Sequence, residues 1–260
     1  MKTLWFFLFT VLLICPHSWG QIASTWDGPF LRYHDTVTDE TIDVLAQNKL
    51  FDEFHDSVGF INAATRVWTF TRASGGSLLT SATTNGVATF TSDAADDSAG
   101  HIASDLVWQQ GKYCNMEARV KIRNPTSGFN VGWSDAQSEA LGGMAVNFSG
   151  VVAGASASDA AVFVHDPDAT TDLIRVVSVK NGTTSTTATT LNTFSNVWRI
   201  YRVSLDPSGN ADFWVDGDHI TQKALGVTAT TSMCAYISGI SRAAGNTYVD
   251  IDYIRVWSQR

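Results

Sequence analysis

From Trp68 to its end, the chain is a succession of short runs rich in β-branched and aromatic residues, separated by turn-forming residues. Roughly a dozen such runs follow one another, with turn signals about every 8–12 residues. Apolar residues do not recur at helical spacing in this region. The pattern predicts an all-β sandwich or barrel. With 260 residues, the chain has room for one large β domain or two small ones and is long enough to bury a substantial core.

Turn signals indicate where hairpins form. Asn-Gly dipeptides stand at residues 85–86 and 181–182, and this pair favours tight hairpin turns because both residues tolerate positive φ. The Pro-Ser-Gly-Asn stretch at 207–210 predicts another tight turn between two strands. The Thr-rich run at 183–190 has low complexity and is expected to be an exposed loop or an edge strand.

The stretch YCNMEARVKIR, residues 113–123, alternates between apolar and polar side chains. Successive strand side chains point to opposite faces of a sheet. One face would carry Cys114 and further apolar residues, and the other Glu117, Arg119 and Lys121. This predicts a half-buried antiparallel strand. By the same alternation, Trp214 in ADFWVD lies on the polar side of its strand.

The first twenty residues have the features of a secretory signal peptide. Lys2 gives a positive start, an apolar run extends from Leu4 to Cys15, and small residues, Ser18 and Gly20, precede the expected cleavage site. The run has 12 residues, whereas a membrane-spanning helix needs ~20, so no membrane partner is expected. The leader predicts secretion. Its start, MKTLWFFL, also resembles immunoglobulin heavy-chain leaders, so the leader could be foreign to the protein. In that case the leader says nothing about the native location, and a virion surface is the alternative.

The charge of the chain limits the classes of partner that it can bind. The chain has a net charge of −8 and no basic cluster, and nucleic-acid binding needs Lys and Arg to neutralise phosphates. Nucleic acid is therefore not expected as a partner.

Beyond the leader only Cys114 and Cys234 remain. Two buried thiols are expected, with a single disulfide left open.

The residues before the strands predict a different organisation. Residues 21–37 show no period and read as an irregular arm, whereas 38–57 offers an N-cap at Thr38 or Asp39 and a loose apolar stripe, which predicts a short helix. The expected domains are a signal peptide (1–20), an arm with a helix (21–65) and a β-sandwich (66–260). The arm is expected to dock to a neighbouring subunit. Its expected anchors are Trp26, Phe30, Leu31, Leu50, Phe51 and Phe54.

Several strands resemble those of a known fold. The strand Y-x-x-x-E-A-R-V-K with the following GFNVGWSD resembles the concanavalin A-like jelly roll of lectins and glucanases. The runs in VWRIYRVSLDPSGNADFWVDGDHI and the final YVDIDYIRVW are similar to other strands of that fold. The resemblance covers residues 66–260 and implies a concanavalin A-like antiparallel β-sandwich.

A narrower resemblance is to tailed-phage particle proteins of the same fold. In these, a KLFDEFHD-like entry precedes W-T-F, E-A-R-V-K, G-F-x-V-G and D-Y-I strands. The matching stretches are residues 50–56, 68–70, 117–121, 128–132 and 252–254. This resemblance implies a structural protein that decorates a virion surface, with capsid subunits as partners.

The sequence lacks the usual carboxylate pattern of a glucanase. Retaining enzymes of this fold carry E-x-D-x-E on one strand, which sets two carboxylates ~5–5.5 Å apart. No such motif exists among the four glutamates. Asp250 and Asp252 share a strand without a glutamate and are expected to face solvent. A lyase site around Tyr113, Glu117 and Arg119 lacks the other strands that such lyases need. The chain is therefore expected not to be an enzyme.

Two acidic turns are candidate cation sites. The first has His101 beside Asp93, Asp96 and Asp97, and the second has His165, Asp166, Asp168 and Asp172. Neither has the spacing of a known calcium loop. No cofactor is expected, and a loop-bound Ca²⁺ stays open as an alternative.

Aromatic and charged residues on the polar strand faces are candidates for binding sugars. Trp214 is the best stacking platform, and Trp133, Glu117 and Arg119 are further candidates. Asn147 and Asn181 stand in N-glycosylation sequons, and Asn181 is the better exposed because it lies in a turn.

Three functions follow from these observations. The first is a non-catalytic surface or structural module, such as a phage decoration protein. The second is a secreted carbohydrate-binding lectin. The third is a glycoside hydrolase or polysaccharide lyase with a divergent site.

Overall fold

The computed structural model describes strands at 22–27, 30–35, 40–43, 46–52, 68–72 and 77–80, and residues 86–92, 94–137, 144–171, 173–192, 196–242 and 246–259. Residues 1–46 and 47–260 form two compact units. The expected signal peptide and Phe54 lie outside the described residues. Within the described part of the chain, no helix has the length and apolar character that crossing a membrane requires.

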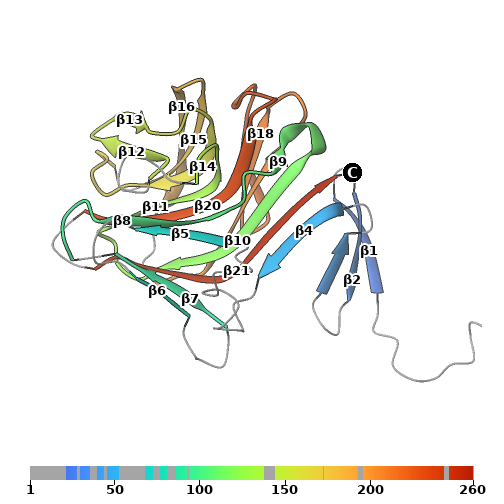
Figure 1. The fold of residues 1–260 in the computed structure, drawn as a ribbon, viewed down its shortest axis with the longest axis horizontal. Coiled ribbons are helices and arrows are strands. Elements are labelled where there is room, and N and C mark those ends of the chain that lie inside the picture. The colour runs from blue at the N-terminus through green and yellow to red at the C-terminus, as the bar shows by residue number, and fades with distance from the viewer. Residues whose placement is uncertain are drawn as a thin grey trace, which may run out of the picture. The chain divides into compact units, whose positions relative to one another are not determined.

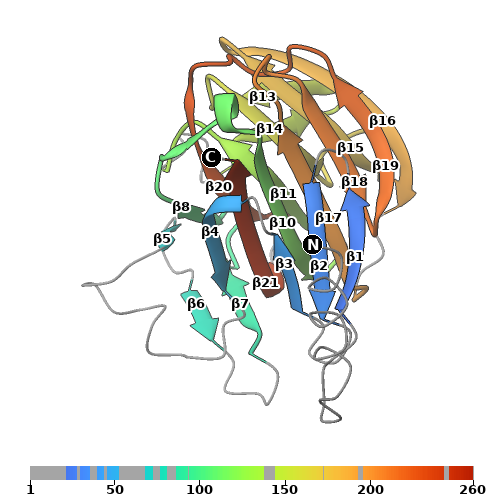
Figure 2. The same cartoon turned by 90° about the vertical axis from the view of Figure 1, so that its right-hand side faces the viewer.

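The second unit contains two antiparallel sheets. The first sheet has the order β19-β18-β17-β10-β21-β7-β6, with β4 also paired to β21. Its strands are β4 (Ala46–Asp52), β6 (Ser77–Thr80), β7 (Ala88–Thr91), β10 (Cys114–Ile122), β17 (Arg199–Leu205), β18 (Ala211–Val215), β19 (Asp218–Lys223) and β21 (Tyr248–Gln259). Figure 2 shows β17, β10 and β21 side by side.

The second sheet has the order β16-β15-β14-β11-β20-β8-β5, and β9 pairs with β20. Its strands are β5 (Trp68–Arg72), β8 (Ala99–Ser104), β9 (Trp108–Gln109), β11 (Ser127–Ser134), β14 (Ala160–His165), β15 (Leu173–Lys180), β16 (Thr183–Asn192) and β20 (Ser232–Ser241). A single turn of 3₁₀-helix, η1 (Gln110–Lys112), precedes β10. The two sheets lie one above the other in Figure 1. The chain crosses between them repeatedly, so the predicted antiparallel β-sandwich is confirmed.

The core lies between the sheets and follows from the alternation along each strand. On β10, Cys114, Met116, Ala118 and Val120 are all at most 2% exposed, as the residue pattern predicts. Aromatic rings join the two layers: Phe163 of β14 and Phe213 of β18 have centroids 5.3 Å apart. Such pairs add to the hydrophobic stabilisation that burial alone provides.

The hairpins form where the turn residues predict them. β6 pairs with β7, β15 with β16, and β17 with β18. Asn181 and Gly182 both have positive φ, as a two-residue turn requires. Position 209 needs glycine for two reasons. Its φ is positive, and a Cβ there would lie 2.4 Å from the carbonyl oxygen of Val227. The Thr-rich run is the edge strand β16, most of whose residues are exposed or half-buried.

A short hairpin covers the outer face of the second sheet. It consists of β12 (Val146–Ser149) and β13 (Val152–Ala155). Beneath it, Val162, Val164 and Tyr236 are fully buried in a second apolar cluster that includes Val146 and Phe148 of the hairpin. This face of the second sheet is therefore packed like a core rather than open to solvent.

The helix predicted over residues 38–57 is wrong, and so is the irregular arm before it. The first unit contains the three-stranded sheet β1 (Ile22–Asp27), β2 (Phe30–Asp35) and β3 (Glu40–Asp43), and β4 belongs to the first sheet of the sandwich. A helix this short is marginal without packing. Thr41 and Ile42 favour strands, and the segment pairs with β2. Of the expected docking anchors, Trp26 and Leu31 pair across β1 and β2, and Leu50 and Phe51 lie in β4.

Candidate functional site

Five charged or aromatic side chains form one row across the outer face of the first sheet. The strand register places Glu117 of β10 opposite Arg202 of β17 and Arg255 of β21. It also places Arg202 opposite Trp214 of β18, and Trp214 opposite His219 of β19. These residues alternate with core residues along their strands, so all five point away from the core. We call them the central row.

Cations and rings alternate along the central row. The Arg202 guanidinium lies 4.8 Å from the centroid of the Trp214 ring and 5.4 Å from that of Trp257. Arg255 lies 4.8 Å from the same Trp257 ring, and the His219 and Trp214 rings are 5.1 Å apart. The guanidinium–ring contacts are worth ~0.5–2 kcal/mol each. They hold Trp214 in one orientation.

Glu117 lies between Arg255 and Arg202 in the row and is held by two donors. The Tyr253 hydroxyl and the Arg255 guanidinium each donate to Glu117 Oε1 at 3.0 Å. Burial and the neighbouring Glu117 carboxylate raise the pKa of Tyr253, so its hydroxyl keeps its proton at neutral pH. The hydroxyl therefore stays a hydrogen-bond donor that fixes the Glu117 side chain.

Polar groups share the outer face with Trp214 on the neighbouring positions of β18 and β19. Asp212 accepts from Gln222 Nε2 at 3.0 Å and lies 2.9 Å from His219 Nε2. The side chains of Asp212 and His219 are 23% and 48% exposed. An aromatic platform beside a half-exposed carboxylate and amide offers both a stacking surface and hydrogen-bonding partners for hydroxyl groups.

Three cations, two on β10 and one directly after it, continue the outer face. Arg119 pairs with Asp252 at 2.7 Å, Lys121 with Asp250 at 3.0 Å, and Arg123 with Asp250 at 2.6 Å. We call Arg119, Lys121 and Arg123 the basic row. Asp250 is only 1% exposed at its side chain, so the expectation that it faces solvent is wrong, because three donors from neighbouring strands cover it.

The buried Asp250 carboxylate links the stability of this face to pH. Burial alone would raise its pKa, but hydrogen bonds from Arg123, Lys121 and Thr89 outweigh burial and hold the pKa below the ordinary value of 3.8. A lowered pKa means that the carboxylate stabilises the fold above its ordinary pKa. This stabilisation is lost as the pH falls through the folded-state pKa.

Replacing Asp250 by asparagine should lower the free energy of unfolding at neutral pH by about 1.5–3 kcal/mol, the range for hydrogen bonds to charged groups. The asparagine chain should also lose less stability than the original chain between about pH 7 and about pH 3, because it lacks this titrating group. Urea unfolding at both pH values measures the effect. Equal acid sensitivity of the two chains would contradict the assignment.

The structure brings three of the four predicted glycan-binding residues together. Glu117, Arg119 and Trp214 lie on the same outer face. Trp133 does not: it is 0% exposed and donates from Nε1 to the carbonyl of Val203 across the core at 3.0 Å. Its selection as a stacking platform was wrong because β11 turns that side chain inward.

Sequence reasoning missed three members of the central row: His219, and the two arginines Arg202 and Arg255. The alternation in RIYRVSL and DYIRVW assigns both arginines to the outer faces of their strands, as it does for Glu117. That signal was available in the sequence. Their common position with Glu117 depends on strand order, and alternation says nothing about strand order.

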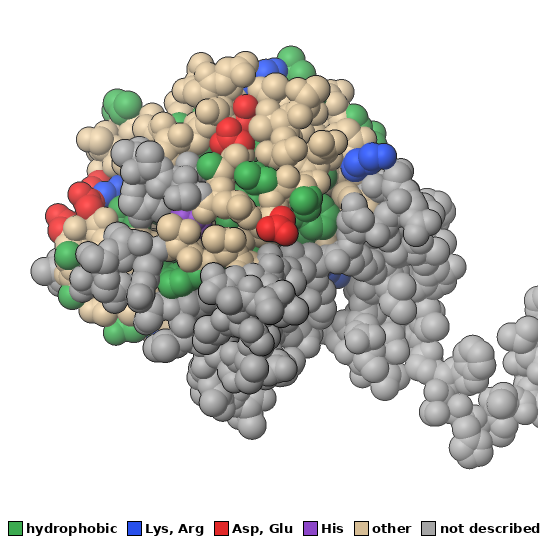
Figure 3. Space-filling view, viewed as in Figure 1, with side chains coloured by type: hydrophobic (Ala, Val, Ile, Leu, Met, Phe, Trp, Pro, Cys, Tyr) green, Lys and Arg blue, Asp and Glu red, His purple; other side chains and the backbone are tan. Residues whose placement is uncertain are grey.

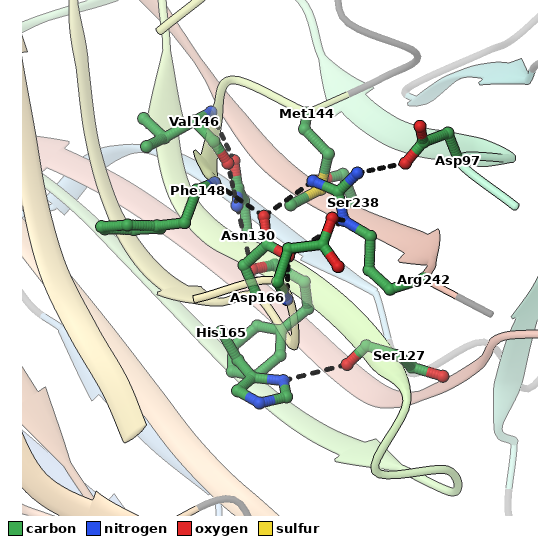
Figure 4. Close-up of polar contacts among 12 residues, drawn as sticks. Asp97, Ser127, Asn130, Met144, Val146, Phe148, His165, Asp166, Ser238 and Arg242 are labelled. Atoms are coloured by element: carbon green, nitrogen blue, oxygen red, sulfur yellow. Dashed lines mark hydrogen bonds and ion pairs between the residues drawn. The ribbon is translucent and has the colours of Figure 1, made fainter. Parts of the chain in front are cut away.

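A second polar cluster anchors the hairpin over the second sheet (Figure 4). Asp166 receives two bonds from Arg242, at 2.9 and 2.7 Å, and accepts from the backbone N–H of Phe148 at 2.7 Å. Asn130 accepts from the N–H of Val146 at 2.8 Å and donates to its carbonyl at 3.0 Å. These side chains satisfy the free edge of β12, as buried backbone groups require.

The two acidic turns considered as cation sites meet at Arg242. Its guanidinium pairs with Asp97 from the first turn, and with Asp166 and, at 3.4 Å, Asp168 from the second. The guanidinium supplies the positive charge that these carboxylates need. Among the described residues, no group of three or more His, Cys, Asp or Glu side chains is arranged to hold a metal ion. His165 instead contacts the carbonyl of Ser127 through Nδ1, at 2.9 Å.

The cysteines and sequons are placed as expected. Cys114 and Cys234 are free and buried, and burial raises the pKa of Cys114 to about 12, which makes its thiol unreactive. Asn181 is exposed in the β15–β16 turn, and Asn147 is half-buried within β12. Glycosylation of either residue stays a prediction, as does export.

Most of the described surface in the view of Figure 3 consists of uncharged polar side chains and backbone. This agrees with a content of charged residues of only 16%. In a chain with so few charges, the exposed guanidinium groups of Arg119 and Arg123 are a distinctive feature of the surface.

No protein-family model and no curated protein matches this sequence. Solved structures do match its fold. The apo Crh5 transglycosylase is 13% identical with a TM-score of 0.56, over 83% of this chain and 86% of that one. The carbohydrate recognition domain of Emp47p is 11% identical with a TM-score of 0.54, over 83% and 98%. The β-glucanase of Bacillus licheniformis is 15% identical with a TM-score of 0.53, over 82% and 99%.

These neighbours contradict the prediction that the chain is not an enzyme, because a transglycosylase and a β-glucanase stand among them. A missing E-x-D-x-E motif removes one catalytic pattern and leaves others possible on the same scaffold. The comparisons agree with the fold that the sequence resemblance implied. The chain has the concanavalin A-like jelly-roll fold of lectins and glucanases.

Proposed function

We propose that this protein recognises carbohydrate through the outer face of the first sheet. The observation that carries the proposal is the Trp214 ring, held between Arg202 and His219 and flanked by the Asp212–Gln222 pair. Sugars present apolar C–H faces and hydroxyl edges, and this arrangement offers a partner for each.

The opposite face of the sandwich is less suited to a ligand. The outer face of the second sheet is covered by the β12–β13 hairpin, and its side chains are buried in an apolar cluster. Among solved structures of this fold, one is a carbohydrate recognition domain and another is a transglycosylase in complex with NAG. These two structures support carbohydrate as the ligand class. A role in a phage particle, and docking of the N-terminal strands to a capsid, stay predictions.

The test is glycan binding by the full chain, first on an array and then by calorimetry with the best ligand. Trp214→Ala should weaken binding at least about tenfold, which corresponds to ~1.4 kcal/mol, and Trp214→Phe should retain part of it because a ring remains. The same ligands are assayed for cleavage by the original chain and by Glu117→Gln, which keeps the shape of the side chain.

Thr186→Ala on the edge strand β16 is the control, because Thr186 is exposed on the other sheet. It should bind like the original chain, and thermal unfolding should show that all variants fold. An array without a glycan ligand, or equal binding by the Trp214→Ala and original chains, would reject this proposal.

A further inference from the structure

The outer face of the first sheet also indicates which glycans it binds. We infer that its ligand is an anionic glycan, one that carries carboxylate or sulfate groups, and that the basic row of Arg119, Lys121 and Arg123 recognises the charge. The inference rests on the proposed function and goes beyond it by naming the ligand class.

The first reason is that cations and carboxylates of this face differ in exposure. The side chains of Arg119 and Arg123 are 40% and 44% exposed. Their partners are deeper: Asp252 is 24% and Asp250 only 1% exposed. Formal charges nearly balance within these pairs, yet a ligand approaching from solvent meets guanidinium groups first. The face is therefore electropositive at its surface.

The second reason is that the cations are held in place before any ligand arrives. The Trp198 ring centroid lies 5.0 Å from the Arg119 guanidinium and 4.8 Å from Lys121 Nζ. The Arg123 guanidinium lies 5.5 Å from the centroid of the Tyr248 ring. Rings beneath long side chains reduce the entropy that binding would otherwise cost, so the basic row is preorganised.

The third reason is the chemistry of the donors. Arg119 gives Nη1 to Asp252, and with 40% of its side chain exposed other guanidinium nitrogens can donate to a ligand. A planar guanidinium matches the geometry of a carboxylate or sulfate better than that of a single hydroxyl. Alternate residues of a strand stand ~6.6 Å apart, so the basic row suits a polymer with repeated charges.

The fourth reason is the contrast with the rest of the protein. The chain carries a net charge of −8, so a polyanion is repelled by the molecule as a whole. An electropositive surface on such a protein concentrates anionic ligands at one place and orients them there. The neighbouring Trp214 platform would stack the sugar ring while the basic row binds its charged group.

The experiment compares two probes with the same backbone and different charge: oligogalacturonate and its methyl ester. The full chain should bind the free acid at least about tenfold more tightly, and the preference should shrink as salt rises toward about 1 M, where charges are screened. Arg119→Gln should reduce the preference about fivefold or more. The double variant Arg119→Gln/Arg123→Gln should remove most of it.

Two controls make the result specific. Lys180→Gln removes one cation from the end of β15 in the other sheet and should leave the preference unchanged. Arg123→Lys keeps the charge beside Asp250 and should retain the preference, which separates a binding effect from a folding effect of Arg123→Gln.

The outcomes are distinct. Equal binding of acid and ester, with Trp214→Ala still weakening both, overturns the anionic class and leaves the proposed function standing. Failure of both probes and of every array glycan rejects the proposed function itself. A DNA duplex bound as tightly as the free acid would show general polyanion binding and overturn the assignment to a glycan.

Discussion

Replacing Trp133 by alanine is expected to lower the free energy of unfolding by about 3–5 kcal/mol, the usual cost of truncating a large buried aromatic residue. The Trp133 side chain is 0% exposed and packs 6.2 Å, centroid to centroid, from the Trp108 ring. Its truncation leaves a cavity between the sheets. It also removes the hydrogen bond from the Trp133 indole to the Val203 carbonyl. Such a loss is a large fraction of the stability of a domain.

Chemical denaturation followed by circular dichroism measures this cost. Trp214→Ala is the matched control, because it removes the same side chain from the outer face of the first sheet. It should change the free energy of unfolding by about 1 kcal/mol, the scale of its ring contacts. If both tryptophans cost the same, the division into a core ring and a surface ring is wrong.

Replacing Asp166 by alanine is expected to cost about 3–5 kcal/mol, because it leaves a buried guanidinium without its main partner. The side chains of Asp166 and Arg242 are 0% and 6% exposed. The change also removes the acceptor of the Phe148 N–H, which fixes β12 over the second sheet. Amide exchange at Phe148 should therefore quicken together with the loss of stability.

Asp97→Ala tests the same guanidinium from its exposed side. Asp97 is 68% exposed, so its loss should cost less than about 1 kcal/mol, as for surface ion pairs. The double change Asp166→Ala/Arg242→Met should recover part of the stability, because it removes the unpaired charge as well. A single change at Asp166 that costs no more than Asp97→Ala would show that the cluster does not hold the hairpin.

The strands of the sandwich were predictable because their signals are local. Alternation along β10 and β18 assigned Cys114 and Phe213 to the core and Glu117 and Trp214 to the outer face. The Asn-Gly turn at 181–182 joined β15 to β16, because a turn type depends on the residues within it. Each of these properties depends on a few neighbouring residues.

The helix prediction at 38–57 failed because its outcome was not local. β4 pairs with β21, roughly two hundred positions later in the chain, and such pairing overrides weak propensity. Trp133 was misplaced for a related reason. An isolated tryptophan in GFNVGWS reads equally well as a platform or as core until the partner sheet is known.

The sequence by itself determined the all-β class, the positions of the main hairpins and the division of each strand into a buried and an outer side. Only the tertiary structure decided what covers each outer face. It covered that of the second sheet with the β12–β13 hairpin and joined Asp97 to Arg242 across 145 positions. It also aligned Glu117, Arg202 and Arg255 into one row. The physical reason is that alternation along a strand separates two faces, whereas strand order and long-range packing decide what each face meets.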